Sequence, residues 1–142
     1  MTEASKRLIV AATLAMGSQW LLSWLMGFIP QVALTTRMTP LGLLDPLNYL
    51  LAACAMAVGG WWAGKRFVPV AVLMTLLLWL AILTVMATSS ASQVHASTAD
   101  NLTAIFKFNQ LGLLCSLVAA ALGAWLGSRL QRAPAAAAPD PA

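Results

Sequence analysis

The sequence predicts an all-α, polytopic membrane protein in which four transmembrane helices form a bundle and both termini are cytoplasmic. Of its 142 residues, 61% are hydrophobic and only 8% are charged, whereas an average soluble domain is about 45–50% apolar and about 25% charged. Four apolar segments are long enough to cross about 30 Å of hydrocarbon as helices. Most basic residues flank one set of segment ends. This composition excludes a soluble enzyme and a disordered chain.

The first predicted helix covers residues 8–29, which contain no charge. Pro30 disfavours a helical conformation at Ile29 and is expected to end this helix. The apolar run exceeds the roughly 7–15 residues of a secretory signal core, so we expect the segment to be retained as a membrane span. A spanning segment this apolar has to be a helix, because hydrocarbon cannot satisfy open backbone groups.

The second and third predicted helices cover residues 46–64 and 67–87. Asp45 followed by Pro46 is typical of an N-cap followed by proline at the first helical position. Pro69 falls in the first turn of the third helix, where its missing N–H costs little. The sequence therefore predicts two helices joined by a tight turn.

The fourth predicted helix covers residues 102–127, with Asp100 or Thr98 as its candidate N-cap. Its apolar character is interrupted only near its start, by Lys107, Asn109 and Gln110. The four helices define a transmembrane domain over residues 1–132. The Pro- and Ala-rich tail, residues 133–142, is expected to be disordered.

The basic residues predict the orientation. Six of the eight flank one set of helix ends, namely Lys6, Arg7, Lys65, Arg66, Arg129 and Arg132, and only Arg37 and Lys107 fall on the other side. The positive-inside rule then places both termini in the cytoplasm and argues against a dual topology. Richness in alanine and leucine with few lysines favours a bacterial inner membrane.

Small residues recur at every fourth position in two of the helices. They are Ala55, Gly59 and Ala63 in the second helix and Ala119, Gly123 and Gly127 in the fourth. Such ridges let helix backbones approach closely in a membrane. They predict either packing of the second helix on the fourth or a surface for a partner membrane protein or a second copy of the chain.

The ends of the second and fourth helices resemble each other. Residues 60–66 and 123–129 both read G-x-W-x-G-x-R, and a cysteine follows an asparagine by six positions in both helices, Cys54 after Asn48 and Cys115 after Asn109. One interpretation is a duplicated two-helix hairpin. The other is convergence, since small residues, interfacial Trp and a cytoplasmic Arg are general preferences of membrane helices.

Three amides define a possible polar path. Gln19 falls near the centre of the first helix, and Asn48 and Asn109 fall near the outer ends of theirs. A mid-membrane amide is costly unless it is hydrogen-bonded, so these residues either line a path for a solute or join helices. No ionisable group falls at mid-membrane, which argues against proton-coupled pumps. The chain resembles small multidrug transporters in size and helix count but lacks their glutamate in the first helix.

The remaining chemistry-bearing residues predict no cofactor, metal or reaction. Cys54 and Cys115 lie in apolar stretches without a CxxC pair, and His95 is the only histidine. His95 with Asp100 supplies two candidate ligands, whereas a catalytic zinc site takes three from the protein. No nucleophile–base pair is evident, and no Lys/Arg cluster suits a nucleic acid. We therefore expect a protein that is not an enzyme.

Two functions remain compatible with these features. The first is an accessory or assembly subunit that acts through helix–helix contacts within membrane lipids. The alternative is a transporter or channel for a small neutral or lipidic solute that uses Gln19, Asn48 and Asn109. The ridges of small residues motivate the first hypothesis, and the three amides motivate the second.

Overall fold

Four long helices and one short hairpin make up the described chain. The computed structural model describes residues 2–28, 37–40, 42–91 and 98–130. The elements in chain order are α1 (Glu3–Met26), β1 (Arg37–Thr39), β2 (Gly42–Leu44), α2 (Pro46–Ala63), the 3-10 turn η2 (Gly64–Arg66), α3 (Phe67–Ala91) and α4 (Thr98–Leu130). The predicted all-helical architecture is confirmed, except that the hairpin was not expected.

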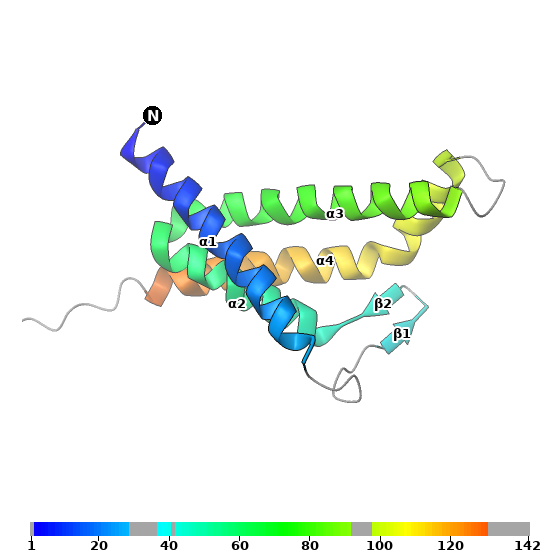
Figure 1. Ribbon diagram of the computed structural model, residues 1–142, viewed down its shortest axis with the longest axis horizontal. Coiled ribbons are helices and arrows are strands. Elements are labelled where there is room, and N and C mark those ends of the chain that lie inside the picture. Colours follow the sequence, from blue (N-terminus) through cyan, green and yellow to red (C-terminus); the bar gives the residue numbers. More distant parts are fainter. Residues whose placement is uncertain (1, 29–36, 41, 92–97, 131–142) are drawn as a thin grey trace, which may run out of the picture.

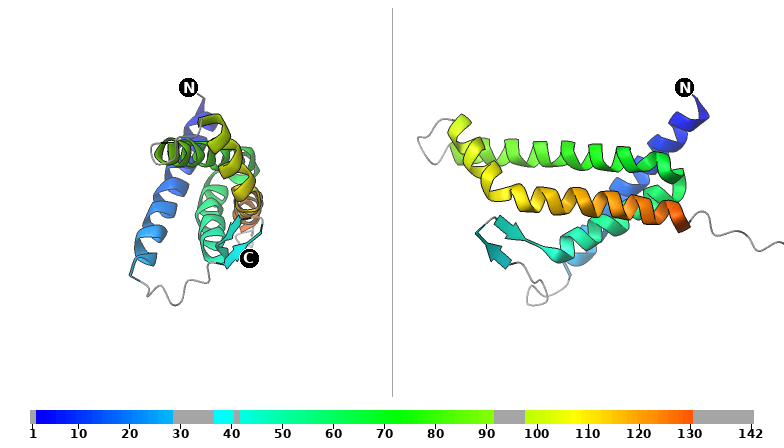
Figure 2. Two further views of the ribbon diagram at one scale, coloured as in Figure 1. Left: turned by 90° about the vertical axis from the view of Figure 1, so that its right-hand side faces the viewer. Right: turned by 180° about the vertical axis from the view of Figure 1, so that it is seen from behind.

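The helices pack around α4. Figure 1 shows α3 and α4 side by side and antiparallel along the long axis of the molecule, with α1 crossing them obliquely, and Figure 2 shows the same arrangement from behind. The most extensive contact joins α2 to α4, followed by the contacts of α3 with α4 and of α1 with α2. The second and fourth helices therefore form the centre of the fold.

Three helical stretches are long and apolar enough to cross a membrane, namely Glu3–Met26, Pro46–Ser89 and Ala99–Leu130. These stretches make the chain an integral membrane protein by length and composition. The middle one is 44 residues long and contains α2, η2 and α3, because the 3-10 turn joins the two helices without a loop. At Gly64 the backbone has φ 69°, a conformation that L side chains rarely adopt. From this turn α2 and α3 run in opposite directions (Figure 1).

The first helix begins and ends earlier than the predicted residues 8–29. It begins at Glu3, because Thr2 caps it by accepting a hydrogen bond from the backbone N–H of Ser5 at 3.3 Å. It ends at Met26, where the N–H of Gly27 donates to the carbonyl of Trp24, three residues back, at 3.0 Å, so that the chain tightens from the α-helical pattern. Pro30, the predicted stop, lies outside the described residues.

The second helix begins where the sequence predicted. Oδ1 of Asp45 accepts a hydrogen bond from the backbone N–H of Asn48 at 3.2 Å, and Pro46 is the first helical residue. The helix ends at Ala63, one residue before the predicted end.

The third and fourth helices are longer than the predicted residues 67–87 and 102–127. Hydroxyl groups at their polar ends bond within the helix, as when Thr88 donates to the carbonyl of Thr84 and Thr103 to that of Ala99, both at 3.0 Å. Such bonds satisfy the side chains locally and let a polar segment remain helical. The start of α4 at Thr98 places Asp100 in the first turn rather than at the predicted cap.

The unexpected hairpin packs on α4. Its strands pair antiparallel, with Arg37 opposite Leu44 and Thr39 opposite Gly42. Gly42 has φ 125°, and a Cβ at this position would overlap the backbone carbonyl of Phe108 in α4. Glycine is therefore required both by its backbone conformation and by the close approach of β2 to α4.

Gly42→Ala is expected to detach the hairpin from α4 and to lower the melting temperature of the purified protein. The matched control is Gly17→Ala on α1, where an added Cβ meets no atom within 4 Å. Because alanine is favoured over glycine in a helix by about 1 kcal/mol, the control is expected to hold or raise the melting temperature. Equal melting temperatures for the two variants would contradict the required contact.

The packed core consists of small residues around one large ring. Its members are Ala11, Ala15, Met56, Phe67, Ala71, Ala120 and Ala124. Phe67 is fully buried, and its ring lies against Gly59. The alanines of this core and the neighbouring Gly59 allow the helices to approach closely. The ring of Phe67 fills the space between them.

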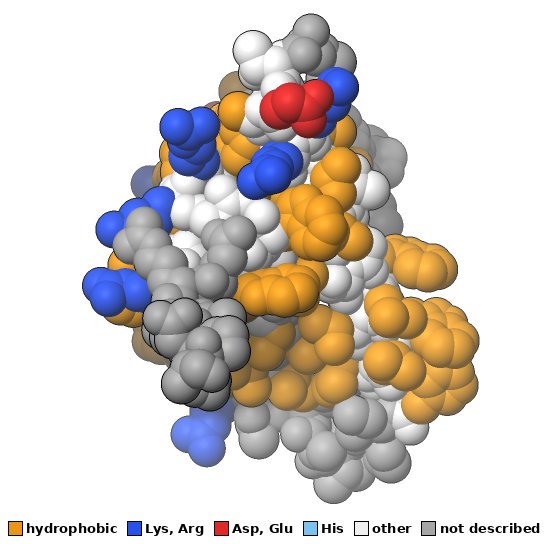
Figure 3. All heavy atoms as spheres, turned by 90° about the vertical axis from the view of Figure 1, so that its left-hand side faces the viewer, with side chains coloured by type: hydrophobic (Ala, Val, Ile, Leu, Met, Phe, Trp, Pro, Cys, Tyr) orange, Lys and Arg blue, Asp and Glu red, His pale blue; other side chains and the backbone are white. Residues whose placement is uncertain are grey.

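Positive charge collects at one end of the bundle. The N-terminus, the turn between α2 and α3 and the end of α4 lie at the same end in Figures 1 and 2. These elements carry Lys6, Arg7, Lys65, Arg66 and Arg129, which we call the basic end. Figure 3 views this end and shows Lys and Arg side chains gathered on it. Arg132 lies outside the described residues.

Candidate functional site

A cavity of about 200 Å³ lies among the four helices, and we call it the polar cavity. All three amides of the predicted polar path line it, and each helix supplies a polar group: Gln19 from α1, Asn48 from α2, Thr75 from α3, and Asn109 and Ser116 from α4. The structure thus brings together residues that are up to 97 positions apart in the sequence.

Helical periodicity explains why these residues meet. Along α2 and its N-cap Asp45 the cavity is lined at positions 45, 48, 49 and 52, and on α3 at positions 75, 78, 79 and 82. Both sets follow the spacing i, i+3, i+4, i+7, which is one face of a helix. Each helix therefore turns a single face toward the cavity.

Several donors in the cavity are already used within their own helices. The Thr75 hydroxyl donates to the carbonyl of Ala71 at 2.9 Å, and the Ser116 hydroxyl to that of Gly112 at 2.8 Å. Nδ2 of Asn109 donates to the carbonyl of Ile105 at 2.8 Å. The hydroxyl and amide oxygens retain lone pairs that can accept. The Thr75 and Ser116 hydroxyls therefore have no donor left for a molecule in the cavity, whereas the side chains of Gln19 and Asn48 add N–H groups to the lining.

Gln19 carries an acceptor without a partner. Its Oε1 is buried and accepts no hydrogen bond within the part of the chain that the structure describes. Leaving a buried polar atom unsatisfied costs about 1–3 kcal/mol. The Gln19 oxygen therefore favours a donor, which a water or solute in the cavity could supply once the amide turns toward it.

Polar groups continue toward the end of the bundle that faces away from the basic end. A second cavity, of about 190 Å³, shares Asp45 and Asn48 with the polar cavity and adds Ser23 and Met26 of α1. Asp45 precedes the first turn of α2 and is partly exposed. The polar cavity is thus bordered at this end by a carboxylate and a further polar space.

The packed core lies between the polar cavity and the basic end. On α1 and α3, which begin at the basic end, Gln19 and Thr75 come after the core residues in the sequence. On α2 and α4, which end there, Asn48 and Asn109 come before them. The order is the same on all four helices, so the cavity is closed toward the basic end by tightly packed apolar side chains.

The sequence did not single out three polar or aromatic residues of the lining, namely Tyr49, Thr75 and Ser116. A helical-wheel signal was available for one of them, since Thr75 lies four positions before Trp79 on a largely aliphatic helix. Ser116 offered no such signal, because a hydroxyl in a membrane helix usually bonds to its own backbone.

The ridge glycines of α4 contact α2 within the chain. A Cβ on Gly123 would overlap the backbone of Ala53, and a Cβ on Gly127 would overlap that of Ala57. The backbones of the two helices therefore touch at these positions. Ala119, the first member of the predicted ridge, is only partly buried.

The ridge of α2 is divided between two neighbours. Gly59 faces the ring of Phe67 on α3, whereas the adjacent Gly60 meets the backbone of Ala124. Gly60 was not part of the predicted ridge. Ala55 is buried and Ala63 is partly exposed at the basic end. Most of the two ridges is therefore occupied inside the bundle.

The two cysteines do not pair. Cys54 is exposed on α2, Cys115 is partly buried on α4, and both are free thiols. No group of three potential metal ligands occurs in residues 2–28, 37–40, 42–91 and 98–130. His95 lies outside these residues.

Comparison of the chain with models of protein families, with curated proteins and with solved structures finds no match. The observations that bear on function are therefore the polar cavity, the packed core that closes it and the basic end.

Proposed function

We propose that the protein crosses the membrane four times, with the basic end in the cytoplasm of a bacterial cell. The reversal of direction at Gly64 supports α2 and α3 as separate spans. The 18 residues of α2 extend about 27 Å, close to the roughly 30 Å of a hydrocarbon core. The positive-inside rule supports the orientation, since five described basic residues share one end.

Within this topology, the polar cavity binds a small neutral solute that offers hydrogen-bond donors, and the protein transports that solute. The unpartnered Oε1 of Gln19 is the observation that carries this proposal. The cavity of about 200 Å³ far exceeds the roughly 10–15 Å³ that one water needs, and it is smaller than typical pockets for larger ligands, about 300–1,000 Å³. Polyols and amides of a few heavy atoms fit both limits.

The closed side of the cavity favours a carrier over an open pore. A solute entering from the end that bears Asp45 reaches Gln19 and Thr75 and then meets the packed core. Passage to the basic end requires the core to separate. The solute would then bind while the packed core is closed and leave after the core opens toward the basic end, as in transporters that expose one binding site to each side of the membrane in turn.

Gln19→Leu is expected to reduce solute flux roughly tenfold, which corresponds to the loss of one hydrogen bond of about 1–1.5 kcal/mol. The measurement is the uptake of urea, glycerol and erythritol into liposomes that contain the purified protein. Stopped-flow light scattering monitors this uptake. The matched control is Gln110→Leu on α4, which makes the same chemical change at an exposed position outside the cavity.

Wild-type protein is expected to accelerate the uptake of at least one of these solutes over protein-free liposomes, and the control variant is expected to match it. Circular dichroism of both variants checks that they remain helical. Wild-type flux equal to the lipid background would overturn the transport proposal. Equal flux in Gln19→Leu and wild type would remove the Gln19 amide from the binding site.

A second candidate function, the accessory or assembly subunit, is favoured by the aromatic face of α1. Trp20 is 72% exposed and Phe28 is 70% exposed, and the Phe28 ring meets that of Trp24 edge to face at 4.8 Å between centroids. A photoreactive residue at position 20 tests this function in native membranes, because the Trp20 side chain is exposed on α1. One partner membrane protein or a second copy crosslinked in high yield supports it, and lipid adducts alone contradict it.

A further inference from the structure

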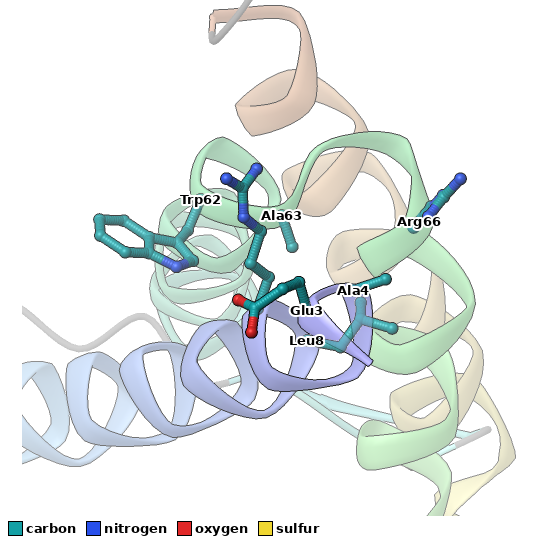
Figure 4. Close-up of a pocket in the computed structure, with 7 residues that line it drawn as sticks. Glu3, Ala4, Leu8, Trp62, Ala63 and Arg66 are labelled. Carbon is teal, nitrogen blue, oxygen red and sulfur yellow. The ribbon is translucent and has the colours of Figure 1, made fainter. Parts of the chain in front are cut away.

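A third pocket, of about 390 Å³, lies at the basic end between the start of α1 and the turn that joins α2 to α3. It is separate from the polar cavity and shares no residue with it. Figure 4 shows the residues around it: Glu3 and Leu8 lie on α1, and Trp62, Ala63 and Arg66 lie at the end of α2 and in the turn, with the Arg66 side chain directed away from the others. Arg7 of α1 also lines the pocket.

The pocket has a positive charge that no acidic group cancels. Oε1 of Glu3 forms an ion pair with Nζ of Lys6 at 2.8 Å. Lys6 therefore neutralises the only acidic residue of the lining. The guanidinium groups of Arg7 and Arg66 then remain as the net charge around the pocket.

The shape and chemistry of the lining suit a phosphate group attached to an apolar body. Guanidinium groups bind phosphate oxygens through two parallel hydrogen bonds, and they do so better than ammonium groups. Leu8, Ala63 and the ring of Trp62 supply apolar walls beside the two arginines. Tryptophan is favoured at the level of lipid headgroups, where one part of the ring is apolar and the other is wet.

We propose that this pocket binds the phosphate of an anionic phospholipid, with the glycerol and the first acyl carbons against Trp62 and Leu8. Basic pockets between membrane helices on the cytoplasmic side are suited to such headgroups. Inorganic phosphate shares the recognised chemistry, but it has no apolar part to occupy the walls. This inference requires only that the basic end lies at a membrane surface, and it does not depend on solute transport.

The test is native mass spectrometry of the full chain in detergent, titrated with phosphatidylglycerol or with phosphatidylcholine. Arg7→Gln combined with Arg66→Gln is expected to reduce retention of the first phosphatidylglycerol roughly tenfold or more, given the usual contribution of each basic residue near anionic lipid. The matched control combines Lys65→Gln with Arg129→Gln. It removes the same charge from the same end, at residues that do not line the pocket.

The control is expected to retain phosphatidylglycerol as the wild type does, and phosphatidylcholine retention is expected to be equal in all three proteins. An excess of inorganic phosphate distinguishes the sources. No displacement of phosphatidylglycerol supports the lipid, whereas displacement supports a phosphate site filled from solution and overturns the lipid as its occupant. Equal losses in both double variants, or no loss in either, would overturn the pocket as an anion site.

Glycerol uptake by the Arg7→Gln, Arg66→Gln protein separates this inference from the proposed transport. Because neither arginine lines the polar cavity, uptake is expected to match that of the wild type in uncharged liposomes. A failure of lipid retention and a failure of transport are therefore observed independently.

Discussion

Gly123→Val is expected to prevent α2 and α4 from packing and to abolish the folded bundle. A Cβ at this position would overlap the backbone of Ala53, and the same close contact recurs at Gly127 with Ala57 and at Gly60 with Ala124. A clash with a side chain is relieved by rotation, but a clash with a backbone requires the helix to move. We therefore expect a loss of at least about 3 kcal/mol, the upper end for an overpacked core.

The measurement is the yield of monodisperse protein in detergent and its thermal unfolding. Gly17→Val is the matched control, because an added Cβ there meets nothing within 4 Å while the helix-propensity change is the same. The control is expected to purify as the wild type does. Similar melting temperatures for the two variants would show that the α2–α4 contact is not as close as the structure indicates.

The spacing of small residues predicts which helices approach closely but not which backbone atoms meet. Ala119, Gly123 and Gly127 repeat at every fourth position, and this periodicity indicates one face of a helix. The choice between Gly59 and Gly60 depends on the rotation of α2, which the tertiary contacts with α3 and α4 determine together. A pattern within one helix holds no information about that rotation.

Local signals predicted the starts of α2 and α3 but not those of α1 and α4. The Asp45–Pro46 start of α2 was predictable because a cap and a proline at the first position act within one turn. The hairpin was missed because three-residue strands are too short for a period-two pattern. The end of α1 at Met26 was missed because the prediction placed the stop at Pro30, and no signal in the sequence marked the tightened turn at Gly27.

The candidate site was predictable only in part. The sequence drew attention to Gln19, Asn48 and Asn109 because an amide in an apolar helix requires a partner. It did not reveal Thr75 or Ser116, since each hydroxyl satisfies itself on its own helix. The cavity appears only when α1 is placed over α2, α3 and α4, and that placement depends on long-range packing.

Phe67→Ala is expected to destabilise the protein by about 3–5 kcal/mol and to make the packed core leaky. Phe67 is the largest fully buried side chain of the core, and removing its ring leaves a cavity. That space lies in the layer that closes the polar cavity toward the basic end. Solute flux is therefore expected to rise while stability falls.

Gly59→Leu is the substitution that we expect to compensate for Phe67→Ala. Alone, it is expected to destabilise the bundle, because a Cβ on Gly59 would overlap the Phe67 ring. In the Phe67→Ala background the leucine has the vacated space to occupy, so the two changes are expected to be non-additive by about 0.5–3 kcal/mol. Unfolding of the two single variants and the double variant in detergent measures this coupling, and strict additivity would contradict the contact.

The same three proteins also test whether the packed core is the barrier to the solute. If it is, glycerol leaks through Phe67→Ala liposomes, and Gly59→Leu closes the leak as it restores stability. The leak and the stability then change together, because one set of side chains determines both. A stable double variant that still leaks glycerol would place the barrier elsewhere. A destabilised Phe67→Ala protein that does not leak would do the same. The polar cavity would then have to open to the membrane side rather than through the core.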